Sequence, residues 1–427
     1  MDAPLDGTSG RADSQIRCSA VCRHWRNSLL SFSGIWSSVD TTKPSQMKLY
    51  LARSREAPLH VNLGWTTSLD VFEQHILPER HRLRSLSIPF QSDSDSHQVV
   101  TQSLVGSAKS LNTLNMWMSD HPFIIPAATL EGISRFAPNI TVLKLYNIFA
   151  NLSSLKFPSM IKLTFRITRP DMSRSGTKDL IQFLGHSPNL EELDLHLPEG
   201  FGVGMPTDTV TLRHLKFAVF NGFATTNEPV RVEVLSILGL PKENLTVDVQ
   251  TRARALPSYI SLSLSAIRLM DTIFPQQSIT AAAIHIKDDP NGFFGHISVC
   301  GERNNWVGLN HVRILNTGGS PFSRLGIWLD PVRLAPLRGI ETLTLGLLKL
   351  PKSPAGAGWL STEVLRTFLR GLDQVRVLNI YKMNVPLVAR ILRPSDCEVL
   401  LPSLEELRIH TYDPPELTRC VEHDKGR

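Results

Sequence analysis

The sequence predicts an α/β fold in which parallel strands and helices stack into an irregular solenoid, preceded by a short helical segment. A Leu-x-x-Leu-x-Leu phrase recurs along the chain, a helical pattern precedes several copies, and a Pro-Asn-type turn joins the two. The clearest copy is residues 180–195, LIQFLGHSPNLEELDL. Four copies place their apolar residues at Ile140, Leu143 and Leu145; at Leu190, Leu193 and Leu195; at Val375, Leu378 and Ile380; and at Leu404, Leu407 and Ile409.

The first part of the chain divides into a polar segment and a helical one. Residues 1–15 are rich in Gly, Ser, Asp and Pro and are expected to be disordered. Residues 16–57 form a helical segment, with one helix expected over 16–30 from its apolar spacing. A short extended piece, IWSSVD, follows it, and a second helix is expected over 44–55 with proline in its first turn.

Residues 58–413 are predicted to be the repeat domain, and residues 414–427 a tail. Its first strand alternates Leu59, Val61 and Leu63. Further strands are expected to begin at Leu83, Leu111, Ile140, Met160, Leu190, Leu212, Val232, Ala281, Leu309, Ile340, Val375 and Leu404, with another near residues 244–249. Apolar strand positions point inward, and helices with stripes such as Leu180, Ile181 and Leu184 cover the strands. Residues 350–360 are expected to be a loop insertion.

Composition and charge exclude several classes of protein. The net charge of +6 is mild for 427 residues, so no nucleic-acid partner is expected. The basic cluster Arg80, His81, Arg82 and Arg84 is interpreted as a solvated face, with a phosphate-binding patch as the alternative. Five scattered cysteines form no disulfide framework, and the sequence has no signal peptide or membrane span. We therefore expect a cytoplasmic or nuclear protein.

No pattern in the sequence indicates catalysis, a cofactor or a metal. Cys18, Cys22 and His24 lack a second ligand pair at zinc-finger distance. The glycines of residues 200–204 have no following Lys-Ser or Lys-Thr and are interpreted as a loop. The nucleophile-elbow and zinc-protease motifs are absent from the sequence, so we expect a binding protein, with an unrecognised hydrolase or transferase site as the alternative.

Two resemblances to known families follow from these residues. The repeat phase resembles divergent leucine-rich repeats over roughly residues 83–410. Residues 19–40, SAVCRHWRNSLLSFSGIWSSVD, resemble the C-terminal half of an F-box, with its Val-Cys-Arg-x-Trp-Arg phrase and a later Ile-Trp pair. Residues 49–63 are similar to a common extension in fungal F-box proteins. The Leu-Pro-x-Glu start and the Ile-Phe pair of an F-box have no counterpart in residues 1–15.

The resemblance implies a substrate-recognition subunit of an SCF-type, cullin-RING ubiquitin ligase. The F-box-like segment would dock on the Skp adaptor subunit, which joins the cullin scaffold, and the repeats would hold an unknown substrate protein. The adaptor-docking residues implied are Val21, Cys22, Trp25, Leu29, Ile35 and Trp36. For Trp25 and Trp36 a structural role, closing the end of the solenoid, is the alternative. A repeat scaffold that binds a protein partner without any ligase is the alternative function.

The residues between the inward-pointing apolar positions are the candidates for substrate contact. They would lie on the outer side of the strands, where an ordinary solvated face is the alternative. The candidate substrate face comprises Lys144, Tyr146, Asp194, Lys216, Arg313, Asn379 and Arg408, with His196 and Thr344 beside them. Their mixed charges favour a protein ligand over nucleic acid.

Overall fold

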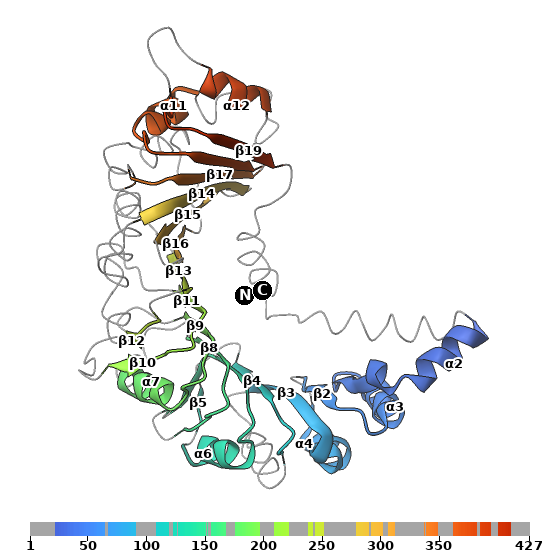
Figure 1. The fold of residues 1–427 in the computed structure, drawn as a ribbon. Helices are drawn as coiled ribbons and strands as arrows, with labels where there is room; N and C mark the ends of the chain where they lie inside the picture. Colours follow the sequence, from blue (N-terminus) through green and yellow to red (C-terminus); the bar gives the residue numbers. More distant parts are fainter. Residues whose placement is uncertain are drawn as a thin grey trace. The chain divides into compact units, whose positions relative to one another are not determined.

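The computed structural model shows an α/β fold, in which large sheets of mainly parallel strands are accompanied by helices (Figure 1). It describes residues 22–64, 67–90, 108–118, 123–125, 127–150, 152, 155–167, 176–196, 209–221, 238–241, 244–251, 279–289, 292–301, 306–311, 337, 339–348, 362–381, 385–393 and 400–410. The described residues up to Leu215 belong to one compact unit, unit 1, and those from Lys216 onward to a second, unit 2. The predicted disorder of residues 1–15, the tail, the loop insertion and the glycines of 200–204 lie outside the described residues.

Unit 1 begins with short elements that lead into its sheet. Helix α2 (Arg23–Ser31) is followed by the 3-10 helix η1 (Ser33–Ser37), strand β1 (Ser38–Asp40), helix α3 (Pro44–Ser54) and strand β2 (Leu59–Asn62). The second helix and the first repeat-domain strand are where the sequence predicted them. The extended piece was expected three residues too early, because Ile35 and Trp36 lie in η1 and only β1 is extended. Since β1 pairs with β2, the sheet already begins inside the segment expected to be helical.

The sheet of unit 1 consists of parallel strands in the order β1-β2-β3-β4-β6-β8-β9. The later strands are β3 (Leu83–Phe90), β4 (Thr113–Met118), β6 (Val142–Tyr146), β8 (Lys162–Arg166) and β9 (Glu192–His196). Before β3 come α4 (Leu69–Val71), η2 (Phe72–Ile76) and η3 (Leu77–Arg82). The other elements are β5 (Phe123–Ile125), α6 (Ala127–Phe136), β7 (Ile148–Ala150), α7 (Gly176–Gly185) and β10 (Val210–Thr211).

The core of unit 1 lies between the strands and the helices, and α6 and α7 lie on the same side of the strand array (Figure 1). The predicted apolar triplets are buried: Leu190, Leu193 and Leu195 are each at most 1% exposed. The predicted stripe of α7 is buried as well, and Phe183 beside it makes an edge contact with Phe157 at 6.2 Å between ring centroids. The core-facing sides of the strands and of the helices are both buried. This explains why apolar residues recur every second residue in the strands and about every 3.6 residues in the helices.

One hydrogen-bonded turn introduces most of these strands. The backbone N–H of the first apolar residue of the phrase donates to the carbonyl three residues earlier, as in Ile140 to Ala137 at 3.3 Å and Leu190 to Ser187 at 3.2 Å. The next two N–H groups then share one carbonyl of the preceding strand's turn, as Glu191 and Glu192 share that of Ile161 at 2.8 and 2.9 Å. Because the same geometry recurs, successive strands begin at the same level and stay in register.

The asparagine of the Pro-Asn turn ties each turn to the one before it. The Asn139 amide donates to the Lys109 carbonyl at 2.9 Å, and the Asn189 amide donates to the Pro158 carbonyl at 2.8 Å. Ser110 makes the equivalent bond to the His81 carbonyl at 2.8 Å. The turn asparagine therefore stabilises the stacking of neighbouring strands, which is the physical reason for this residue type at that place.

Replacing Asn189 with alanine is expected to lower the free energy of unfolding by about 1 kcal/mol, because one carbonyl loses its donor. Urea denaturation followed by circular dichroism measures this loss. Lys178→Ala, an exposed change on α7, is the matched control and should stay within about 0.5 kcal/mol. Equal midpoints for Asn189→Ala and the unsubstituted chain would show that this bond does not stabilise the stack.

Unit 2 contains a sheet in the order β11-β13-β16-β15-β14-β17-β18-β19. Its strands are β11 (Phe217–Asn221), β13 (Thr246–Thr251), β14 (Ile279–Asp289), β15 (Gly292–Gly301), β16 (Trp306–His311), β17 (Thr342–Leu348), β18 (Val377–Tyr381) and β19 (Glu406–His410). The short β12 (Leu238–Gly239) and the helices α11 (Thr362–Arg370) and α12 (Val385–Leu392) complete the unit. The strand expected near residues 244–249 is β13.

The expectation of parallel strands throughout is wrong in unit 2. Strand β15 pairs antiparallel with both β14 and β16, whereas β13–β16, β14–β17, β17–β18 and β18–β19 are parallel. Asp289 pairs with Gly292, so only two residues separate β14 from β15. A Pro-Asn-Gly sequence at this point is a hairpin signal, and a two-residue connection permits only antiparallel pairing.

Two further expectations about the strands differ from the structure, and a third is not tested by it. The phrase expected from Leu212 is shifted by three residues: Leu215 makes the turn bond, to the Leu212 carbonyl, and β11 begins at Phe217. The strand expected at Val232 lies outside the described residues. In the phrase from Leu404, Leu407 and Ile409 are 41% and 40% exposed rather than buried. They lie on β19, the edge strand of the described sheet.

Candidate functional site

The two tryptophans of the F-box-like segment have different environments. Trp36 is 0% exposed, and its indole N–H donates to the Leu29 carbonyl at 2.8 Å. Its ring meets Tyr50 edge-on at 5.2 Å between centroids, and the Arg53 guanidinium lies 4.4 Å from the ring centroid. Trp36 therefore joins η1 to α2 and α3 from inside, and it offers no surface to a partner. Leu29 and Ile35 are half-buried around it.

Helix α2, by contrast, buries none of its side chains among the described residues. Trp25 on this helix is 55% exposed, and Phe32 directly after it is 63% exposed. The exposed Cys22 begins the helix as its N-cap, with its sulfur accepting from the Trp25 N–H at 3.5 Å. Val21 lies outside the described residues. Large exposed aromatic side chains on one short element are typical of a contact surface.

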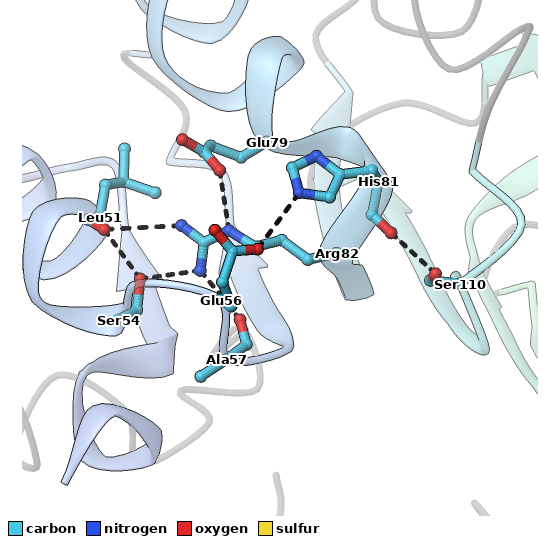
Figure 2. Close-up of polar contacts among 8 residues, drawn as sticks. All are labelled: Leu51, Ser54, Glu56, Ala57, Glu79, His81, Arg82 and Ser110. Carbon is cyan, nitrogen blue, oxygen red and sulfur yellow. Dashed lines mark hydrogen bonds and ion pairs between the residues drawn. The ribbon is translucent and has the colours of Figure 1, made fainter.

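Arg82 connects the end of helix α3 and the residue Ala57 to the strands that follow. Its guanidinium donates to the Ser54 hydroxyl at 3.0 Å and to the Ala57 carbonyl at 2.9 Å, and its Nε donates to Glu79 at 2.8 Å (Figure 2). A longer bond of 3.5 Å reaches the carbonyl of Leu51. These acceptors include the C-terminal end of α3, where a helix attracts a positive charge.

The interpretation of residues 80–84 as a solvated face is therefore wrong for Arg82, whose side chain is 6% exposed. It holds for His81 and Arg84, which are exposed. His81 lies 3.8 Å from Glu56 across the same junction (Figure 2). Sequence reasoning missed this contact because the acceptors are distant in the sequence: Leu51 and Ser54 of α3 precede Arg82 by 31 and 28 positions, and Ala57 precedes it by 25.

Part of the predicted substrate face is brought together in unit 1. The register places Lys144 of β6 beside Thr164 of β8 and Asp194 of β9, in one row across the sheet. We call this row, with Asn115 of β4 at its other end, the polar row. In each strand these residues alternate with buried apolar residues, so they lie on the side of the sheet opposite the core.

A second row, one pleat further along, contains Trp117, Tyr146, Arg166 and His196. Arg166 links the two rows, because its guanidinium donates to Asp194 Oδ2 at 2.5 and 3.1 Å and lies 5.6 Å from the Tyr146 ring centroid. Lys162 and Glu192 form a further ion pair at 2.5 Å. Arg166, Thr164 and Asn115 were not predicted, although counting two residues along each strand identifies them.

The predicted substrate-face residues of unit 2 are placed differently. Asn379 lies on β18 and donates to the Thr344 hydroxyl at 3.4 Å. Arg408 lies on β19 and is paired with Glu406 at 2.6 Å. Lys216 is exposed but lies in the turn before β11, where its carbonyl accepts from the Thr246 N–H. It was predicted to lie on a strand because the phrase was expected to begin at Leu212. Arg313 lies outside the described residues.

Two titratable groups in the part of the chain that the structure describes have pKa values shifted by burial. Burial raises the pKa of the Cys300 thiol to about 11, which keeps it protonated and unreactive at neutral pH. Burial, and secondarily the charge of Arg84, lower the pKa of His60. Within the described ranges, no group of three or more His, Cys, Asp or Glu residues could hold a metal ion, and no helix is long and apolar enough to cross a membrane.

Comparison of the sequence with protein-family models gives no match, and comparison with curated proteins gives none either. The F-box and leucine-rich-repeat resemblances therefore rest on the residues quoted above.

Proposed function

We propose that this chain is a substrate-recognition subunit of an SCF-type ubiquitin ligase. In this proposal α2 and the residues after it dock on the Skp adaptor, which connects the chain to the cullin scaffold. The strands stack as a leucine-rich-repeat-like solenoid and hold the substrate protein. The chain performs no chemistry. It raises the effective concentration of a substrate lysine near the ubiquitin-charged enzyme.

The observation that supports docking most strongly is the exposure of Trp25 and Phe32. Both belong to the segment whose Cys-Arg-x-Trp-Arg phrase resembles an F-box, and they are 55% and 63% exposed. Exposed aromatic residues of this size are the usual anchors of protein interfaces. Trp36 supports docking indirectly, because its bond to the Leu29 carbonyl connects η1 to α2.

The contacts of Arg82 support a fixed connection between the surface proposed to bind the adaptor and the surface proposed to bind the substrate. A substrate receptor has to hold its substrate at a defined position relative to the adaptor. Arg82 fixes the C-terminal end of α3 to the start of β3 through buried charged hydrogen bonds. The docking segment and the substrate-face residues of unit 1 then belong to one compact unit rather than to two flexibly linked parts.

Copurification of the tagged full-length chain with Skp and cullin from its own cells tests the proposal. We expect both proteins with the unsubstituted chain and at least tenfold less with Trp25→Ala, because Trp25 would contact the adaptor. Ile161→Ala is the matched control: Ile161 is another exposed large apolar residue of unit 1, at 41%. A folded chain that captures neither protein would favour the repeat scaffold without ligase linkage.

A further inference from the structure

Two buried oxygen atoms on the substrate side of unit 1 have no hydrogen-bond donor within the described ranges. They are Oδ1 of Asn115 and Oδ1 of Asp194, at the two ends of the polar row. The side chain of Asp194 is 6% exposed, and Arg166 occupies only its other oxygen. The amide nitrogen of Asn115 already donates to Ser87 at 3.0 Å. A buried acceptor without a donor is unfavourable, so each oxygen is a place where a ligand N–H group is stabilised.

The charges between these oxygens favour a negative ligand. Two of the cations on this face are neutralised, Lys162 by Glu192 and Arg166 by Asp194. Lys144, by contrast, forms no hydrogen bond or ion pair with another residue in the described part of the chain. It lies in the polar row between Asn115 and Thr164. The polar row therefore presents an acceptor at each end and an unneutralised cation between them.

We propose that the polar row binds an acidic segment of the substrate protein in extended conformation. A carboxylate of the segment pairs with Lys144, and its N–H groups donate to the free oxygens of Asn115 and Asp194. Adjacent strands are about 4.8 Å apart, so these residues, three strands apart, are separated by roughly 14 Å, which about four residues of extended chain span. Tyr146 and Trp117 in the next row offer an aromatic surface to an apolar side chain of the segment.

The same features disfavour two other ligands. A basic peptide would face repulsion from Lys144, and Asp194 is already neutralised by Arg166. A nucleic-acid backbone presents phosphate oxygens, which only accept hydrogen bonds and therefore leave both orphan oxygens unsatisfied. The inference rests on the proposed function, since it assigns the chemistry of the substrate at the face already described.

An array of dodecapeptides with equal numbers of acidic, basic and uncharged sequences, probed with the labelled full-length chain, tests this inference. We expect at least tenfold stronger binding to the acidic set than to the basic set. Lys144→Glu should abolish this preference, and Asn115→Ala should weaken acidic binding about threefold to tenfold. Lys178→Glu on α7 makes the same change of charge away from the face and should bind like the unsubstituted chain.

Three results would overturn the inference: no preference for acidic peptides, an equal loss with Lys178→Glu, or stronger binding of a labelled 20-nucleotide single strand than of any peptide. The array contains no adaptor, and adaptor capture does not involve Lys144. Acidic binding without Skp capture would therefore sink the ligase proposal and leave this inference intact. Skp capture without a preference for acidic peptides would contradict this inference and leave the ligase proposal intact.

Discussion

Replacing Trp36 with alanine is expected to lower the free energy of unfolding of unit 1 by about 4 kcal/mol. The side chain is 0% exposed, so its removal leaves a cavity against Tyr50. The change also deprives the Leu29 carbonyl of its donor and Arg53 of the ring that it covers. Urea denaturation followed by circular dichroism measures the loss, and hydrogen exchange of the α3 and β2 amides assigns it to unit 1.

Two further variants separate the causes. Trp36→Phe keeps an aromatic ring and loses the indole N–H, so about 1–2 kcal/mol is expected from the bond and the smaller volume. Trp25→Ala removes an exposed ring and should stay within about 0.5 kcal/mol. If Trp36→Ala were as mild as Trp25→Ala, the segment before β1 would not be packed as described.

Replacing Arg82 with alanine is expected to lower the free energy of unfolding by about 3 kcal/mol, because a buried hydrogen-bonded charge is removed. The Ser54 hydroxyl and the Ala57 carbonyl lose their donor. Glu79 is a third exposed and can be rehydrated, so we expect the lower end of the range for such pairs. Faster hydrogen exchange at the C-terminal end of α3 should accompany the loss.

The neighbouring arginine provides the control for Arg82. Arg84 is exposed, and Arg84→Ala should change the free energy of unfolding by no more than about 0.5 kcal/mol. Arg82→Lys keeps the charge but cannot reach all the acceptors that the guanidinium fork reaches, so an intermediate loss is expected. Equal effects of Arg82→Ala and Arg84→Ala would mean that Arg82 does not hold α3 against the strands.

The strand and helix pattern was predictable wherever one period dominates a segment. Leu59 and Val61 alternate along β2, Leu63 follows its last residue in the same alternation, and all three are buried. The triplets beginning at Ile140 and Leu190 are inward-facing for the same reason. The position of the strand after Leu212 was predicted wrongly because Leu212 and Leu215, three residues apart, can each be the first apolar residue of the phrase. Only the turn hydrogen bond of Leu215 distinguishes the two.

The remaining features depend on contacts between distant parts of the sequence. Arg82 stands among other charged residues, a pattern that usually indicates a solvated face. Its burial follows from acceptors on α3, which the local sequence does not show. The pairing of Arg166 with Asp194 across neighbouring strands was also invisible, although Asp194 was identified as outward-facing. Strand β15 was missed because the parallel pattern of the phrases led us to expect no hairpin.

The most direct test of the central claim is calorimetric titration of the purified full-length chain with the purified Skp adaptor of the same organism. The account predicts saturable one-to-one binding, lost in the Trp25→Ala, Phe32→Ala double variant and retained in Ile161→Ala, since only the first pair belongs to the docking segment. Absence of binding by an unsubstituted chain that unfolds cooperatively would contradict it, as would equal affinity for the double variant.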